Sequence, residues 1–246
     1  KDVTFSYPNG EEAVLKNIDF SCHKGQKIAV IGSTGSGKST LVKLMNRFYD
    51  VSRGSIEING VDIRKYNLES LRAQIGYVAQ KAHMFKGSIQ SNICFGKPEA
   101  SVEEMVHAAT VAQASDFIST REHGYEDEIA EDGTNISGGQ KQRLSIARVI
   151  LKKPSLYIYD DSFSALDFKT DATLRKALKP EVKNAIFFVV AQRISTIMDS
   201  DMIIVLDEGQ IIGMGTHAQL LKDCSVYQEI AHSQLTQKEL DDYERN

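Results

Sequence analysis

Short apolar runs alternate with amphipathic stretches near the start of this chain. The segment Lys27–Ile31 is apolar after its first residue, which is typical of a strand buried on both faces. The segment Lys38–Arg47 follows, with apolar residues at helical spacing, so it is predicted to form a helix. The residues between them are mostly Gly and Ser, which predicts a tight connection from strand to helix.

The same alternation returns in the last third of the chain, whereas the middle is different. From residue 81 to residue 151 the apolar spacing is helical and no strand is expected. We therefore predict an α/β fold with an N-terminal antiparallel β part and an inserted α-helical part at 81–151. Strands are expected at Val3–Tyr7, Ile18–Cys22, Leu156–Tyr159, Ala185–Val190 and Met202–Leu206, with a hairpin over 55–63.

The connection before the first helix carries candidate chemistry. It fits the phosphate-binding pattern G-x-x-x-x-G-K-[ST], in which glycines let backbone N–H groups approach phosphate oxygens. Lys38 can reach the terminal phosphates of a nucleotide, and the Ser39 hydroxyl can ligate Mg²⁺. A Gly-rich turn without a ligand is the alternative, but the flanking strand and helix favour phosphate binding. The expected nucleotide-binding residues here are Gly32, Ser33, Thr34, Gly35, Ser36, Gly37, Lys38, Ser39 and Thr40.

Composition and charge limit the possible partners and compartment. The chain has 246 residues and a net charge of −4, so it offers no overall basic character and no nucleic-acid partner is expected. Its three cysteines are isolated in sequence, which favours a reducing compartment and argues against a zinc site. No apolar run approaches the ~20 residues of a membrane helix. Because the chain enters a predicted strand at once, we expect it to be a piece of a longer polypeptide.

A second Gly-rich segment, Ile136–Gln140, lies near the end of the predicted helical part and precedes the strand expected at Leu156–Tyr159. Ser137 is suited to cap a helix, and the two glycines after it allow close approach of an anion to the helix start. The segment closely resembles the L-S-G-G-Q signature of ABC ATPases, with Ile136 at the leucine position. The resemblance implies nucleotide contacts from Ser137, Gly138, Gly139 and Gln140.

Further motifs extend this resemblance over essentially the whole chain. Segment 156–160 resembles the Walker B strand ending in Asp160, and 164–167 resembles the D-loop. Gln80 falls at the Q-loop position, and Tyr7 lies where the family stacks an aromatic ring on adenine. Segment 85–93 resembles the residues that follow the Q-loop in exporters. The resemblance implies one ABC ATP-binding domain over 1–246 with a RecA-like P-loop NTPase core, which binds ATP with Mg²⁺ through Ser39, Gln80 and Asp160.

Two positions depart from the family pattern for an active site. Asp161 stands where the family usually has the glutamate that activates water, and its side chain is one methylene shorter. Gln192 replaces the usual histidine and cannot become a cation. With Gln80, these are the expected catalytic residues. Since the binding motifs are intact, the sequence predicts good ATP binding with slow hydrolysis.

The resemblance also implies partners. In this family two ATP-binding domains meet head to tail, and each ATP lies between one domain's phosphate loop and the other's signature. We therefore expect a second, non-identical nucleotide-binding domain, a transmembrane domain of the same transporter, and a place at the cytoplasmic face of a membrane. Two alternatives stay open: a soluble ABC ATPase of DNA repair or translation, and a nucleotide sensor that does not hydrolyse ATP.

Overall fold

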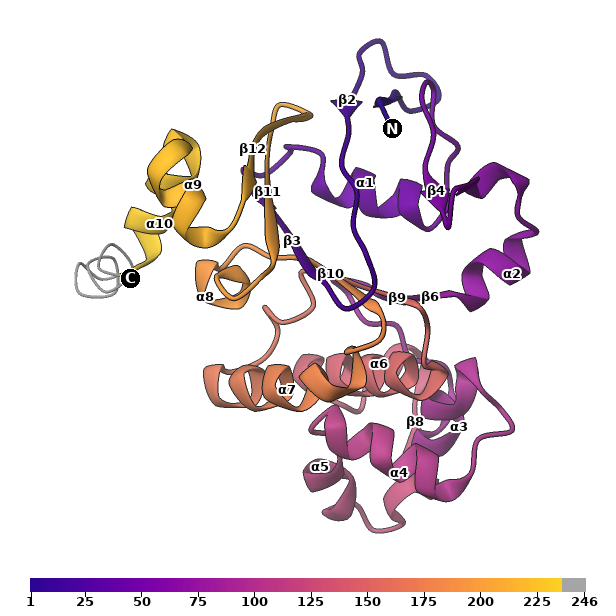
Figure 1. Ribbon diagram of the computed structural model, residues 1–246. Coiled ribbons are helices and arrows are strands. Elements are labelled where there is room, and N and C mark those ends of the chain that lie inside the picture. Colours follow the sequence, from indigo (N-terminus) through magenta and orange to yellow (C-terminus); the bar gives the residue numbers. More distant parts are fainter. Residues whose placement is uncertain (236–246) are drawn as a thin grey trace. The chain divides into compact units, whose positions relative to one another are not determined.

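The computed structural model describes residues 1–235 of the chain (Figure 1). The charged end at 238–246, which was expected to fray, lies outside the described residues. The chain forms two compact units. The first contains Lys1–Gln74 and the chain from Ile186 onward, and the second contains Ile75–Ala185.

The first unit contains four neighbouring strands in the order β12-β11-β3-β10. β3 is parallel to both β10 and β11, whereas β12 runs antiparallel to β11. Ile28, Ala29 and Val30 of β3 are fully buried, as expected for a strand between two parallel neighbours. The strands are β3 (Lys27–Gly32), β10 (Ile186–Val190), β11 (Met202–Asp207) and β12 (Gln210–Gly215).

Two short antiparallel pairs complete the strands of the first unit. β4 (Glu57–Ile58) and β5 (Val61–Asp62) form the predicted hairpin. β1 (Val3–Phe5) pairs with β2, which is Leu15–Ile18 and not the predicted Ile18–Cys22. The prediction was wrong because Leu15 and Ile18 are the buried partners of the β1 residues, whereas the residues after Ile18 leave the ladder.

The helices of the first unit include α1, which begins at the phosphate-binding segment. Near the C-terminal end, α10 is anchored by Tyr227 and Ala231, both fully buried. The helices are α1 (Lys38–Met45), α2 (Leu68–Ala73), α8 (Ile194–Ile197), α9 (His217–Asp223) and α10 (Ser225–Gln234), with a 3₁₀ turn, η1 (Ile63–Lys65).

The second unit is mainly helical, with one pair of parallel strands, β6 (Ile75–Val78) and β9 (Leu156–Asp160). Figure 1 shows α3 and α4 beside α6, and α5 beside α4. The helices are α3 (Ile89–Ile93), α4 (Val102–Val111), α5 (Ser115–Ser119), α6 (Gly138–Lys152) and α7 (Phe168–Glu181), with 3₁₀ turns η2 (Cys94–Gly96), η3 (Gly124–Glu126) and η4 (Glu131–Gly133).

The expectation that no strand lies within 81–151 was wrong. β7 (Gly87–Ser88) pairs antiparallel with β8 (Glu128–Ile129) inside this segment. Each strand has two residues, which is too short for an alternating pattern to be visible in the sequence. Helices and parallel strands nevertheless dominate, so the predicted α/β class is confirmed.

Candidate functional site

The phosphate-binding segment follows β3. Neighbouring atoms lie so close to its backbone that glycine is required at two positions. A Cβ atom at Gly32 would lie 2.0 Å from the carbonyl oxygen of Leu206. At Gly37, where φ is 103°, a Cβ would lie 2.6 Å from Cδ2 of Leu15 and the backbone would be strained. The loop therefore holds a shape that other residues could not adopt, with its backbone accessible to an anion.

Lys38 lies over this loop. Its Nζ donates hydrogen bonds to the carbonyl oxygens of Gly32 at 2.8 Å and Ser33 at 2.6 Å, and to Oγ of Ser36 at 3.3 Å. α1 begins at Lys38 and has no acidic residue in its first turn, so its positive end is not neutralised from within the helix. The Ser39 hydroxyl beside it is on an exposed residue. Loop, lysine and hydroxyl fit a phosphate chain with Mg²⁺.

Tyr7 is joined to the same helix. Its hydroxyl lies 3.0 Å from Oγ1 of the buried Thr40. Phe5 and Tyr49 contact its ring edge-to-face, with centroids at 5.0 and 5.2 Å. These contacts fix a partly exposed aromatic ring beside the phosphate-binding helix, as a platform for a base requires.

Gln192 lies two residues after β10, and its side chain is exposed. Its backbone carbonyl accepts a hydrogen bond from Nε2 of Gln234, the last residue of α10, at 2.8 Å. Gln234 was not among the predicted site residues. No motif marks it, and its partner lies 42 positions earlier in the chain.

In the second unit, Asp160 ends β9 and is 6 % exposed. The Tyr77 hydroxyl donates a hydrogen bond to its Oδ2 at 3.4 Å. Tyr77 is the register partner of Ile158, and side chains two apart in a strand share a face, so Tyr77 lies diagonal to Asp160. Burial, followed by the Asp160 charge, raises the pKa of Tyr77 to about 12. Tyr77 therefore remains a donor at neutral pH, and no sequence motif marks this residue.

Asp161 lies in contact with Gln80. Both residues were predicted from the sequence to be catalytic. Nε2 of Gln80 donates to Oδ2 of Asp161 at 3.0 Å. Asp161 is buried and has a φ of 49°, which is uncommon for a residue with a side chain. Its carbonyl oxygen accepts from Oγ of Ser164 at 2.7 Å. Both the backbone and the carboxylate of Asp161 are thus held from within this unit.

The signature segment begins α6 with a capping box. Oγ of Ser137 accepts from the Gln140 N–H at 3.2 Å, and Oε1 of Gln140 accepts from the Ser137 N–H at 2.9 Å. A Cβ at Gly138 would meet no atom within 4 Å. The box fixes the helix start, and Gly138 keeps its surface open to an approaching group.

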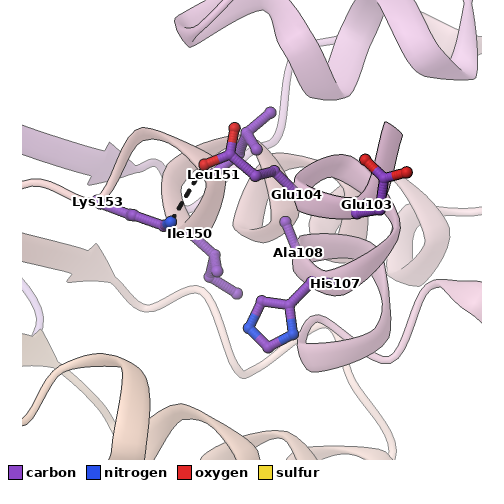
Figure 2. A pocket seen from close by; sticks show the side chains of 7 residues that line it. All are labelled: Glu103, Glu104, His107, Ala108, Ile150, Leu151 and Lys153. Atoms are coloured by element: carbon purple, nitrogen blue, oxygen red, sulfur yellow. Dashed lines mark hydrogen bonds and ion pairs between the residues drawn. The ribbon is translucent and has the colours of Figure 1, made fainter. Parts of the chain in front are cut away.

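A pocket of about 260 Å³ lies elsewhere in the second unit, between α4 and the end of α6 (Figure 2). None of the predicted site residues lines it. Its rim includes Glu104, which pairs with Lys97 at 2.7 Å and with Lys153 at 3.2 Å. Hydrogen bonds from these lysines lower the pKa of Glu104 to about 2. The lining residues are Glu103, Glu104, His107, Ala108, Ile150, Leu151 and Lys153.

The first unit alone defines the class of protein. A Gly-rich loop joins a buried parallel strand to a helix, its lysine lies over the loop, and an aromatic platform is tied to the same helix. This is the construction of a P-loop protein that binds a nucleoside triphosphate.

The comparisons with known proteins give the family. The ABC transporter family matches residues 15–164, more than half of the chain, and the chain belongs to that family as an ATP-binding domain. An uncharacterized ABC transporter ATP-binding protein of Mycobacterium bovis is 44% identical over 94% of this chain and 40% of its own length. A putative multidrug export ATP-binding/permease protein of Bacillus subtilis has the same identity and coverage.

A solved structure of a bacterial Atm1-family ABC exporter with ATP bound is similar to this chain with a TM-score of 0.91. It is 37% identical and matches 94% of this chain and 41% of that one. The chain thus spans about 40% of the length of the relatives named above. The RecA-like P-loop NTPase fold and the resemblance to ABC exporter domains are confirmed, and ATP with Mg²⁺ is the cofactor pair of this ATPase family. Within residues 1–235, no helix has the length and apolar character needed to cross a membrane.

Proposed function

We propose that this chain is the ATP-binding domain of an exporter subunit in which ATP binding is strong and hydrolysis at its own phosphate loop is slow. The observation that carries the proposal is the pair of substitutions at 161 and 192, next to intact binding motifs. The chain would act as a clamp on ATP in a two-part motor, with most of the turnover at the partner's site.

We assign ATP binding to the residues of the intact motifs. Tyr7 stacks on adenine, the loop from Gly32 to Thr40 binds the phosphates, and Lys38 neutralises their charge. Ser39 and Asp160 bind Mg²⁺, with Gln80 at the metal or its water. The capped start of α6, from Ser137 to Gln140, serves the ATP of the second domain.

Slow hydrolysis follows from Asp161. A general base must reach the attacking water, and correct geometry is required before a suitable pKa matters. The aspartate carboxylate is one methylene shorter than glutamate, and Oδ2 accepts a hydrogen bond from Gln80. Gln192 adds a second loss, because its neutral amide can hydrogen-bond a terminal phosphate but cannot add positive charge to it.

The transmembrane domain of the same transporter is the first proposed partner, and residues 81–151, assigned as the inserted subdomain, supply the contact. Phe85 and Phe95 stack with centroids at 4.3 Å and are 46 % and 59 % exposed. Arg148 of α6 lies over both rings, at 5.3 and 5.7 Å from their centroids. Such a rigid apolar patch suits a loop from the membrane domain, and the Bacillus subtilis relative is named as an ATP-binding/permease protein.

A non-identical nucleotide-binding domain is the second proposed partner. It would carry glutamate and histidine at the positions of Asp161 and Gln192, so that the assembly retains one fully equipped site. Both domains would lie at the cytoplasmic face of the membrane. None of the relatives named above supports the soluble alternative in DNA repair or translation.

The test is single-turnover ATP cleavage by this chain assembled with a partner whose own glutamate has been replaced by glutamine. Tight ATP binding with slow but measurable cleavage is expected. Rapid cleavage would contradict the proposed slow site, and complete absence of cleavage would favour the nucleotide sensor.

A further inference from the structure

The turn that carries Gln192 is closed by a side chain from the far end of the chain. Nε2 of Gln234 donates to the carbonyl oxygen of Gln192 at 2.8 Å, and its Oε1 accepts from the Ile194 N–H at 2.8 Å. The Ile194 N–H can only donate, so the orientation of the amide is set by the backbone it contacts.

The local sequence explains why an outside amide is used. Ile194 is the first residue of α8, and its N–H is among the groups that a helix leaves without an intrahelical partner. The preceding residue, Arg193, occupies the N-cap position, but a guanidinium group has no acceptor and makes no side-chain cap here. Gln234 supplies the missing acceptor and at the same time a donor for Gln192.

The helix that provides Gln234 is a firm support. Tyr227 and Ala231 of α10 are fully buried, and the Tyr227 hydroxyl lies 2.7 Å from Nδ1 of the buried His217 in α9. The amide of Gln234 therefore fixes the backbone on both sides of Arg193 from an anchored helix. The backbone at Gln192 limits the rotamers, and so the directions, that its side chain can take.

We propose that Gln234 is a positioning residue that holds Gln192 toward the terminal phosphate of ATP. This inference rests on the proposed role of Gln192. It predicts that Gln234 affects only nucleotides that possess the third phosphate, since ADP offers Gln192 nothing to contact. A residue that merely stabilised the fold would change the affinities for ATP and ADP together.

The experiment is calorimetric titration of the chain with ADP and with a non-hydrolysable ATP analogue, each with Mg²⁺. Gln234→Ala should lower the affinity for the analogue about threefold to tenfold, which corresponds to the loss of about one hydrogen bond. The affinity for ADP should stay unchanged. Gln234→Glu should act similarly because it keeps the acceptor for Ile194 but loses the donor to Gln192. The matched control is Gln228→Ala on the same helix, because the Gln228 amide donates to the carbonyl oxygens of Leu221 and Lys222 in α9.

A double substitution separates this inference from the function on which it rests. Suppose that Gln192→Ala lowers the affinity for the ATP analogue, and that adding Gln234→Ala to this variant lowers it no further. The role of Gln192 at the terminal phosphate and the positioning role of Gln234 are then both supported. If Gln192→Ala acts and Gln234→Ala does not, only the positioning role is overturned. If Gln192→Ala has no effect, the assignment of Gln192 to the terminal phosphate fails. Equal weakening of both nucleotides by Gln234→Ala would show a structural role and overturn the inference.

Discussion

The side-chain amide of Gln80 donates a hydrogen bond to the carboxylate of Asp161 over 3.0 Å. In the sequence these residues are 81 positions apart, yet both were expected to act on the same reaction. A buried carboxylate needs donors, and Gln80 supplies one to the group that would have to accept a proton from water. The contact holds the carboxylate of Asp161 in place, and our proposal that hydrolysis is slow treats this carboxylate as a poor general base.

Lys38→Ala should weaken ATP binding by about 100-fold, because the loop loses its cation and charge-assisted hydrogen bonds of about 1.5–3 kcal/mol each. Direct titration with Mg²⁺ and ATP measures this. Lys24→Ala, which removes an exposed lysine from a turn, is the charge-matched control and should bind as the parent does. An unchanged affinity in Lys38→Ala would remove the phosphate-binding role of the loop.

Two substitutions at Tyr7 separate the contribution of its aromatic ring to ATP binding from that of its hydroxyl group. Tyr7→Ala should lower the affinity for ATP about tenfold, since stacking of a base on an aromatic ring contributes about 1–3 kcal/mol. Tyr7→Phe keeps the ring and loses only the contact with Thr40, so its affinity should stay within about threefold of the parent. If the two variants bound equally, the hydroxyl and not the ring would be the important group.

Phe95→Ser should abolish assembly with the membrane domain without changing ATP affinity. The side chain is 59 % exposed, so its removal takes little from the core. Cross-linking from segment 85–93 to the membrane domain measures assembly, and titration with ATP measures the nucleotide affinity. Val61→Ser, which removes a similarly exposed apolar side chain from the β4–β5 hairpin, should assemble normally. Normal assembly of Phe95→Ser would contradict the docking patch.

Glu104 should give a pH-dependent contribution to stability. Its pKa is lowered from the ordinary 4.5 to about 2, first by the Lys97 hydrogen bond and then by Lys153. A carboxyl group with a lowered pKa stabilises the fold fully above pH 4.5, and this is lost as the pH falls toward 2. The difference in melting temperature between the parent and Glu104→Gln should therefore shrink below pH 4.5. A pH-independent difference would contradict this, and Glu99→Gln serves as the control.

The sequence predicted the parts whose chemistry lies in consecutive residues. The phosphate-binding loop is one such part, because Gly32, Gly37 and Lys38 belong to one continuous run that fits a known pattern, although the contacts that require the two glycines come from Leu206 and Leu15. The predicted bounds of β2 were wrong, because the pairing of Leu15 and Ile18 with β1, and not the local pattern, determines where this strand lies. The roles of Tyr77 and Gln234 were also missed. Each depends on contacts between segments that are distant in the sequence, and no local pattern of residues indicates such contacts.

The most direct test of the account replaces the two altered residues with those the family usually carries. Asp161→Glu combined with Gln192→His should raise single-turnover ATP cleavage at this site, by up to the 10²–10⁴-fold that a positioned base contributes, while ATP affinity changes little. The measurement is made with a partner whose own site cannot cleave ATP. Cleavage by the double variant at the same rate as by the parent would contradict the claim that these two positions make the site slow.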